Sequence, residues 1–201
     1  MFNDFALRML MMWPIIPLAL IQLHLFPSFW RKIGLWTYLV VLLEWLPVAY
    51  IIRSLQDVLL QHEFYVTTPI IVIGVFLVVG GIVLHGWTAK LLGIKATVGY
   101  TELKPDDNVN NDNLVMSGPF SVVRHPSYGA HSLIIVGTFL ITGVIAVGIT
   151  ALIDFLIAYF VTMELEEREL IERFGDQYME YQMKVPKFFP KIGVHNDRDR
   201  A

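Results

Sequence analysis

The chain has 201 residues, of which 55% are hydrophobic and only 16% are charged, and it contains no cysteine. Soluble domains carry about 25% charged residues, so this composition indicates a lipid bilayer as the main solvent and excludes a disordered or collagen-like chain. The formal charge of −3 gives no indication of a nucleic-acid partner, and the lack of cysteine excludes disulfides and thiolate metal sites. We predict one domain and no metal centre.

Several apolar regions match the length of a membrane-spanning helix, for which about 20 residues are needed. The first three are predicted as helices at Met9–Phe26, Ile33–Ile52 and Pro69–Leu92. The next apolar region, Leu133–Met163, is too long for one crossing, and Gly143 near its middle is a break point. We therefore predict a hairpin of helices over 128–142 and 145–174. The expected fold is an all-α integral membrane protein with about five transmembrane helices and a cytosolic C-terminal helical segment.

The positions of Lys and Arg predict the orientation in the membrane, because cytoplasmic loops are enriched in both. With the C-terminus in the cytosol, only Arg8 and Arg53 fall on the outer side. The cytosolic side then holds Arg31, Lys32, Lys90, Lys95, Lys104, Arg124, Arg168, Arg173, Lys184, Lys187, Lys191, Arg198 and Arg200. The sequence therefore predicts a multi-pass protein with an outer N-terminus and a cytosolic C-terminus, in the plasma membrane if the cell is prokaryotic.

Polar and aromatic residues are densest between Gly118 and Tyr128, at the entry to the fourth predicted helix. Pro126 suits a first helical turn, and the free N–H groups there favour an anionic group. Arg124 adds a positive charge that can bind a carboxylate through two parallel hydrogen bonds. The alternative interpretation is that Arg124 and His125 only extend to the membrane surface.

A second charged segment runs from Glu164 to Gly175. Helical spacing places Glu167 on the same face as Met163, Leu170, Ile171 and Phe174, and a carboxylate on an apolar face needs a cationic partner. The pairs Glu164–Arg168 and Glu169–Arg173 fit ordinary surface contacts. Gly175 is predicted to end the helix, and Asp176 to cap a short helix that ends before Pro186.

Ionisable residues also fall within or near the predicted spans, at Glu44, Asp154, His24 and His85. At such depth these groups pair, form structural interhelical hydrogen bonds, or line a cavity or substrate path. His131 follows Tyr128 by one turn and is a weaker candidate for substrate contact.

The motifs G-P-F-x-x-V-R-H-P-x-Y, E-E-x-x-L-x-x-x-F-G-x-x-Y-x-x-Y and V-P…F-P, in this order, resemble the isoprenylcysteine carboxyl methyltransferase family, which is related to the membrane phospholipid methyltransferases. They lie at Gly118–Tyr128, Glu166–Tyr181 and Val185–Pro190, and the resemblance covers roughly Gly74–Lys191. It implies a single membrane domain over 1–201, in which N-terminal helices at 1–68 precede a methyltransferase-like core with a cofactor pocket at 69–201.

The resemblance further implies S-adenosylmethionine as cofactor and an amphiphilic acceptor, such as a prenylated cysteine or a lipid. Arg124, Glu167 and Lys184 would then act in catalysis. The cofactor would be bound by Arg124, His125, Pro126, Tyr128, Glu166 and Glu167. Lys184 stands where eukaryotic members carry Arg, which replaces a planar fork by a point charge and puts a prenylcysteine substrate in question.

Two other functions share part of the pattern. Membrane sterol and steroid reductases, which use NADPH, also carry a stretch like R-H-x-x-Y, but the paired Glu166 and Glu167 favour the methyltransferase. A phospholipid or small-thiol methyltransferase of the same superfamily is the alternative within the family. A small transporter or assembly factor would explain the helices but not the charged C-terminal motif.

Overall fold

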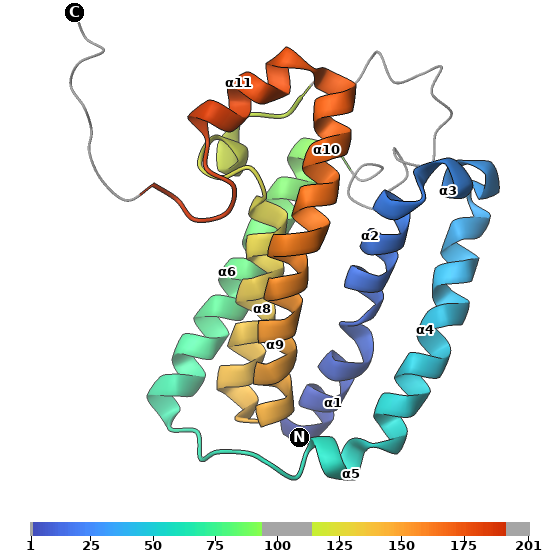
Figure 1. The fold of residues 1–201 in the computed structure, drawn as a ribbon. Helices are drawn as coiled ribbons and strands as arrows, with labels where there is room; N and C mark the ends of the chain where they lie inside the picture. Colours follow the sequence, from blue (N-terminus) through green and yellow to red (C-terminus); the bar gives the residue numbers. More distant parts are fainter. Residues whose placement is uncertain (1, 94–113, 192–201) are drawn as a thin grey trace, which may run out of the picture.

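The computed structural model describes residues 2–93 and 114–191, and its regular elements in these ranges are helices (Figure 1). In chain order they are α1 (Phe2–Met12), α2 (Ile15–Leu25), α3 (Pro27–Ile33), α4 (Trp36–Ser54), α5 (Gln56–Leu59), α6 (Thr68–Leu92), the 3-10 turn η2 (Gly118–Ser121), α8 (Pro126–Thr142), α9 (Ile145–Ile157), the π-turn η3 (Ala158–Thr162), α10 (Met163–Phe174) and α11 (Asp176–Lys184). The cationic residues Lys95, Lys104, Arg198 and Arg200 lie outside the described residues.

Four helical stretches of the described chain are long and apolar enough to cross a membrane: Phe2–Leu25, Trp36–Ser54, Thr68–Leu92 and Ile145–Phe174. The fourth predicted span, 128–142, forms α8, which at 17 residues is the short helix that the sequence predicted and is not among these four. The prediction of an all-α integral membrane protein is thus confirmed. In Figure 1, α10, α11 and α3 lie at one end of the bundle, and α5 and the start of α1 lie at the other.

The first span differs from the prediction because it begins at Phe2 and is broken between α1 and α2. The break follows from Pro14 and Pro17, which have no N–H to donate to the helical ladder. Across it, the carbonyl of Met11 accepts a hydrogen bond of 2.7 Å from the indole N–H of Trp45 on α4. The second span begins at Trp36 instead of Ile33, because Gly34 (φ 59°) ends the short α3.

Gly143 forms the turn of the predicted hairpin, which is confirmed. It has φ 69° and ψ 1°, a left-handed conformation that favours glycine. The loop before α6 pairs with this turn, since Phe64 N donates to Gly143 O at 3.1 Å and Ile145 N donates to His62 O at 2.9 Å. A Cβ atom on Gly143 would lie 2.5 Å from Phe64 O, so the turn also requires glycine for space.

Small residues bring α6 and α8 into close contact along their length. A Cβ atom on Gly137 of α8 would lie 2.6 Å from the carbonyl oxygen of Gly74 on α6. About two turns further along α6, a Cβ atom on Gly81 would lie 2.8 Å from the carbonyl oxygen of Ala130. Membrane helices associate through such small-residue contacts because lipid provides no hydrophobic drive between them. This seam fixes α8, and with it the segment before α8.

The second helix of the hairpin runs from α9 through η3 into α10 without a break, as predicted for 145–174. Gly175 (φ 54°) ends α10, also as predicted. The predicted capping by Asp176 is wrong, because Asp176 is the first residue of α11 and the N-cap is Gly175, without a side-chain hydrogen bond. The bend between the two helices falls at this glycine, whose positive φ ends α10.

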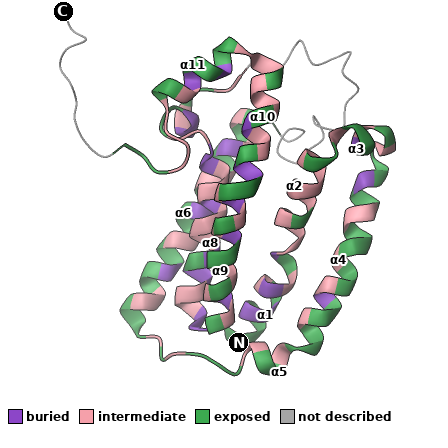
Figure 2. Ribbon diagram, in the orientation of Figure 1, coloured by how far each residue is buried: buried purple, intermediate pink, exposed green. Residues whose placement is uncertain are grey.

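Buried residues gather where α8 meets α1 and α9 (Figure 2), in a core formed by Ala6, Leu10, Trp13, Ile135, Val144, Val147 and Ala151. Large apolar side chains are exposed instead on the outer faces of the bundle. Phe76 on α6 is 73% exposed and Leu152 on α9 is 59% exposed. Exposed apolar faces of this extent are compatible with lipid and costly in water.

Candidate active site

The segment that precedes α8 is held in place by the chain that follows α11. The backbone N–H of Arg124 donates to Pro186 O at 2.9 Å, and that of His125 donates to Lys187 O at 3.1 Å. The two motifs that lie farthest apart in the predicted site are thereby joined through their backbones. Pro186 fits here because its carbonyl is used and an N–H is not required.

The guanidinium group of Arg124 is fully engaged inside the protein. Its Nε donates to Oε1 of Glu167 at 2.9 Å, and one terminal nitrogen lies 2.8 Å from the same oxygen. The other terminal nitrogen donates to the carbonyls of Val185 at 2.6 Å and Gln182 at 3.2 Å. Arg124 therefore ties α10 to α11 and to the chain after it, and the predicted use of its fork for a ligand carboxylate would compete with these contacts.

Glu167 is the buried centre of the network, with 7% of the residue exposed. Besides Arg124, its Oε1 contacts Nε2 of His125 at 2.9 Å, and its Oε2 accepts a hydrogen bond of 3.0 Å from Gln182. The sequence required a cationic partner for this carboxylate, and the structure provides two, Arg124 and His125. Both carboxylate oxygens are occupied, so Glu167 positions other groups.

His125 lies between two carboxylates. Its Nδ1 is 3.5 Å from Oε2 of Glu166, and its Nε2 is 2.9 Å from Oε1 of Glu167. Burial alone would lower the pKa of His125, but the hydrogen bonds and charges of the two glutamates outweigh it and the pKa is raised. The imidazolium form, which can donate from both nitrogens, matches these two acceptors.

Glu166 differs from Glu167 in being only partly satisfied. Its side chain is 33% exposed, and its buried Oε2 has no well-aligned hydrogen bond besides the ion pair with His125. The phenol of Tyr128 donates a hydrogen bond to this carboxylate, and the ring of Tyr128 lies 5.7 Å from that of His125. An ionised carboxylate can accept about four hydrogen bonds, so a partly exposed Glu166 with these two partners can still bind an ammonium or hydroxyl group of a ligand.

Two buried tyrosines of α11, Tyr178 and Tyr181, lie beside the network. Tyr181 donates from its hydroxyl to Phe120 O at 2.5 Å, and burial raises the pKa of Tyr181 to about 12. The hydroxyl of Tyr178 is buried without a hydrogen-bond partner within the described part of the chain. Pro126, at the first turn of α8, is fully buried beneath them.

The structure brings together all the predicted cofactor residues, namely Arg124, His125, Pro126, Tyr128, Glu166 and Glu167. It does not bring Lys184 to them, because that side chain is 73% exposed on α11 and lies 3.5 Å from Glu180. The family resemblance assigned Lys184 to the site, but the helix turns its side chain outward.

Lys187 is a residue that sequence reasoning missed. Its Nζ contacts Oε1 of Glu164 at 2.5 Å and donates to Tyr159 O at 3.0 Å, within the π-turn η3. Glu169 likewise pairs with a distant group, Nδ1 of His24 at 2.7 Å. Two of the glutamates assigned to local helical pairs thus hold distant segments against α10. A lysine directly after Val-Pro, near a surplus of glutamates, was the available signal.

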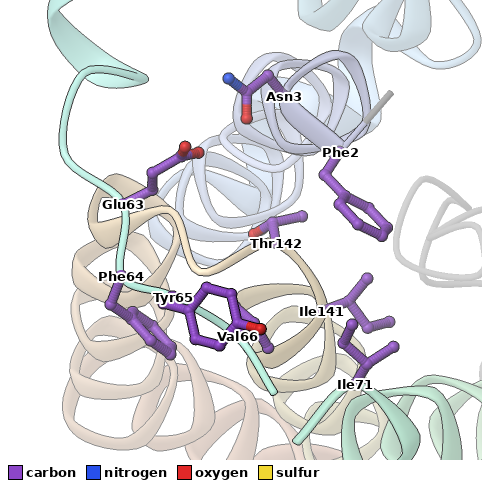
Figure 3. A pocket seen from close by; sticks show the side chains of 9 residues that line it. All are labelled: Phe2, Asn3, Glu63, Phe64, Tyr65, Val66, Ile71, Ile141 and Thr142. Atoms are coloured by element: carbon purple, nitrogen blue, oxygen red, sulfur yellow. The ribbon is translucent and has the colours of Figure 1, made fainter. Parts of the chain in front are cut away.

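A cavity of about 400 Å³ lies at the opposite end of the bundle (Figure 3). Its walls come from the start of α1, the loop before α6 and the end of α8, and are formed by Phe2, Asn3, Glu63, Phe64, Tyr65, Val66, Ile71, Ile141 and Thr142. Apart from Glu63 it holds no charged group, so it offers none of the acid–base or charge chemistry of the Arg124–Glu167 network.

Comparisons with known proteins match the part of the chain that holds most of these residues. The family described as phospholipid methyltransferase matches residues 69–177, which include both charged motifs. The chain is 34% identical over 111 residues to the cobalt-zinc-cadmium resistance protein CzcN of Cupriavidus metallidurans, covering 54% of this chain and 50% of that protein. It is 32% identical over 125 residues to the protein-S-isoprenylcysteine O-methyltransferase of Xenopus laevis, covering 60% of this chain and 41% of that protein.

The matched region spans half or less of each of these relatives, and no solved structure matches the chain. The resemblance that the motifs indicated is confirmed, and the reductase alternative receives no support from these matches. Because the family match covers more than half of the chain and contains the buried network, the chain belongs to the phospholipid methyltransferase family.

Proposed function

We propose that this chain is an integral membrane methyltransferase that uses S-adenosylmethionine and modifies a lipid-tailed acceptor, most like a protein-S-isoprenylcysteine carboxyl O-methyltransferase. The observation that supports this most is the buried network of Arg124, His125 and Glu167 with the half-exposed Glu166 beside it. A buried charge network is costly to build, and here Oε2 of Glu166 has only the long ion pair with His125 at 3.5 Å.

The residues present fit S-adenosylmethionine, which carries an ammonium group, ribose hydroxyls and a sulfonium. Glu166 offers the remaining acceptor capacity of its partly exposed carboxylate, and the hydroxyl of Tyr178, which has no hydrogen-bond partner within the described residues, offers a second polar contact. When bound, the cofactor supplies an activated methyl group. We assign Glu166 to cofactor binding and Arg124, His125 and Glu167 to the positioning of Glu166, with Pro126 and Tyr128 as walls.

The protein's part in the reaction is then mainly alignment. An in-line methyl transfer needs the acceptor atom, the methyl carbon and the sulfur in one line, and a carboxylate acceptor is already ionised at neutral pH. The network supports this because each of its members is held by at least two elements. Lys184 retains its proposed catalytic role only if its exposed side chain moves, and Lys184→Met tests that.

An acceptor with a lipid tail is favoured by the position of the network at the end of four membrane-length helices. Such an acceptor can keep its tail among the exposed apolar faces and present its head to Glu166. Each methylene that stays in lipid saves about 0.8 kcal/mol. Within the same family, a phospholipid amine is the alternative head group, and the family match to phospholipid methyltransferases favours testing it.

We further propose that this end of the bundle faces the cytosol. The described cationic residues of α3, α10 and α11 gather at the end that holds Arg124, whereas Arg53 lies at the other end. The bias of Lys and Arg toward the cytosolic side then gives an outer N-terminus. A reporter fused in the loop at Gln56–Glu63 should be accessible from outside, and an inaccessible reporter would reverse this orientation.

The cofactor assignment is tested by measuring S-adenosylmethionine binding to the detergent-solubilised chain. Glu166→Gln removes the free carboxylate and should weaken binding by roughly tenfold or more, the scale of one charge-assisted hydrogen bond. Glu172→Gln makes the same change at an exposed position of α10 and should leave binding unchanged. NADPH serves as the competing cofactor.

Two results would contradict the proposal. If the wild-type protein binds NADPH but not S-adenosylmethionine, the chain is a reductase and the proposal is wrong. Equal binding by wild type and Glu166→Gln would remove Glu166 from the cofactor site. Methyl transfer to S-farnesylcysteine derivatives and to phosphatidylethanolamine, measured side by side, then distinguishes the two head groups.

A further inference from the structure

A histidine of the N-terminal helices lies beside the candidate active site. His24 is in the last turn of α2, which packs against η3 and α10. Its side chain is only 7% exposed, and its Nδ1 lies 2.7 Å from Oε2 of Glu169 on α10. His24 also interacts electrostatically with Glu166, the carboxylate that we assign to the cofactor. The helix α2 therefore borders the site, although it lies outside the residues that the family match covers, 69–177.

One face of α10 presents two carboxylates that meet histidines of different helices. Glu166 and Glu169 are three residues apart, so they are neighbours on this face. Glu166 pairs with His125 at the start of α8, and Glu169 pairs with His24 of α2. Both carboxylate side chains are partly exposed, at 33% and 29%. A ligand that reaches Glu166 therefore meets an imidazole about one helical turn away.

The contact with Glu169 determines what the imidazole of His24 can offer. It fixes the ring through Nδ1, so the other nitrogen, Nε2, lies on the side of the ring away from Glu169. The imidazolium form donates from both nitrogens, and the negative charges of Glu169 and Glu166 attract a positive charge on this ring. In that form His24 can bind an anionic group of a ligand beside Glu166.

The amino-acid end of S-adenosylmethionine requires such a pair of opposite charges. It carries an ammonium and a carboxylate on one carbon, and Glu166 matches only the ammonium. Residues three apart on a helix have Cβ atoms about 5–6 Å apart, which is a distance that one amino-acid group can bridge. A negative group at Glu166 and a positive group beside Glu169 thus match the two halves of this end.

The other cations that the motifs suggested are less suited to the carboxylate. The guanidinium of Arg124 is occupied by Glu167 and by backbone carbonyls, and Lys184 is exposed on α11. Arg173 also lies on this face of α10, but it is seven residues from Glu166, which is about 10 Å along the helix. His24 is therefore the better candidate.

We propose that His24 binds the carboxylate at the amino-acid end of the cofactor, while Glu166 binds the ammonium. Glu169 is a positioning residue that holds the imidazole. The proposal rests on the proposed function, since it assumes S-adenosylmethionine at Glu166. It adds to that function a cofactor contact from the N-terminal helices, so the core at 69–201 does not form the cofactor site alone.

Three ligands that differ in their charged groups test the assignment. S-adenosylmethionine carries the ammonium and the carboxylate, its decarboxylated form carries the ammonium alone, and methylthioadenosine carries neither. Binding of each to the detergent-solubilised full chain is measured by calorimetry. We expect the wild type to bind S-adenosylmethionine about tenfold more tightly than the decarboxylated form, the scale of one charge-assisted hydrogen bond.

Variants separate a role in binding from a role in folding. His24→Gln can keep a contact with Glu169 but removes the charge, so it should abolish the tenfold preference and leave the other two affinities unchanged. Glu166→Gln should weaken both ammonium-bearing ligands and spare methylthioadenosine. Glu169→Gln should reduce the preference partly, because the imidazole is held less firmly. His62→Gln, in the exposed loop at the far end of the bundle, is the matched control and should change none of the three.

Three results would overturn the proposal. Equal weakening of all three ligands in His24→Gln would show that α2 only supports the fold. A preference that survives in His24→Gln and is lost in Arg173→Gln would assign the carboxylate to Arg173. A wild type without the preference would show that the carboxylate is not bound. Failure of the proposed function looks different, because the wild type would then bind none of the three ligands, and both proposals would be wrong.

Discussion

The charged network at the end of the bundle and an inner group formed by Trp13, His85, His131 and Asp154 both involve α8, yet their polar atoms are paired to different extents. In the network, both oxygens of Glu167 and all the nitrogens of Arg124 have partners. In the inner group, the indole N–H of Trp13 faces the carboxylate of Asp154, and Nδ1 of His85 has no hydrogen-bond partner within the described residues. The network is the costlier to assemble, and the inner group is the less completely paired.

This difference separates positioning from binding. A group whose hydrogen bonds are all used inside the protein can hold its neighbours, but it has nothing to offer a ligand without losing a bond. By that criterion Glu166, and not Glu167, is the ligand-binding member of the pair, although the sequence motif treats them alike. The comparison therefore predicts large effects on folding from the network and effects on affinity from the unfilled positions.

The largest effect is expected from Glu167→Gln, which leaves the positive charges of Arg124 and His125 buried without their shared partner. Removing one side of a buried ion pair costs about 3–5 kcal/mol. We expect the free energy of unfolding in detergent to fall by that amount, measured by thermal or chemical denaturation. Glu166→Gln should cost much less, since Glu166 is one-third exposed. Equal losses in the two variants would erase the distinction between them.

The protonation of His125 predicts how the network depends on pH. Its pKa is raised above the ordinary value of 6.5 by the two glutamates, so the folded protein binds this proton more tightly than the unfolded chain. The stabilisation is therefore fully present below about pH 6.5 and is lost as the pH rises through the raised pKa. The unfolding temperature of the wild type should fall over that window.

Glu166→Gln provides the comparison for the pH effect. It removes one of the two carboxylates that raise the pKa of His125, so the fall in unfolding temperature should begin at a lower pH. A wild-type unfolding temperature that rises with pH over the same window would mean that the histidine is neutral in the folded protein.

The close packing of α6 against α8 holds α8, and with it the network, in place, and two adjacent glycines of α6 test this packing. A Cβ atom on Gly81 would lie 2.7 Å from Ile134 Cγ1 and 2.8 Å from Ala130 O, whereas one on Gly80 meets nothing within 4 Å. Overpacking of this kind costs about 1–3 kcal/mol, so Gly81→Ala should destabilise the fold by that much. Gly80→Ala should be neutral or stabilising by up to about 1 kcal/mol. Similar stabilities for both variants would show that the helices do not pack as closely as described.

Much of the fold was predictable because it depends on local chemistry. Apolar length predicted the spans, and Gly143 and Gly175 predicted the two reversals, since left-handed backbone is a property of single residues. The start of the first span was missed because a helix with two prolines can bend and continue. The failed cap at Asp176 shows that a positive φ at Gly175 is sufficient to begin α11.

The site was predictable only as a set of residues. The motifs identified Arg124, His125, Glu166 and Glu167, but which oxygen is occupied depends on Gln182, Val185 and Pro186, which are backbone or amide partners without a charge pattern. Lys187 and His24 were missed as partners for the same reason, because ion pairs between distant segments leave no periodic signal. The outward orientation of Lys184 depends on its position around the axis of α11, which the motif does not specify.

The smallest effect is expected where α11 meets η2. Tyr181 is 5% exposed and donates to Phe120 O, so Tyr181→Phe removes one neutral hydrogen bond and leaves a buried carbonyl unpaired. The expected cost is about 0.5–1.5 kcal/mol, visible as a modest loss in the free energy of unfolding. Because burial raises the pKa of Tyr181 to about 12, the hydroxyl stays a donor throughout the window in which His125 titrates, and the loss should be the same at both ends of that window. Tyr65→Phe, at a position 89% exposed, removes the same atom without a comparable loss. A loss in Tyr181→Phe that changes with pH would mean that this contact and the imidazolium are coupled, and that the aromatic residues of α11 belong to the charged network as well as covering it.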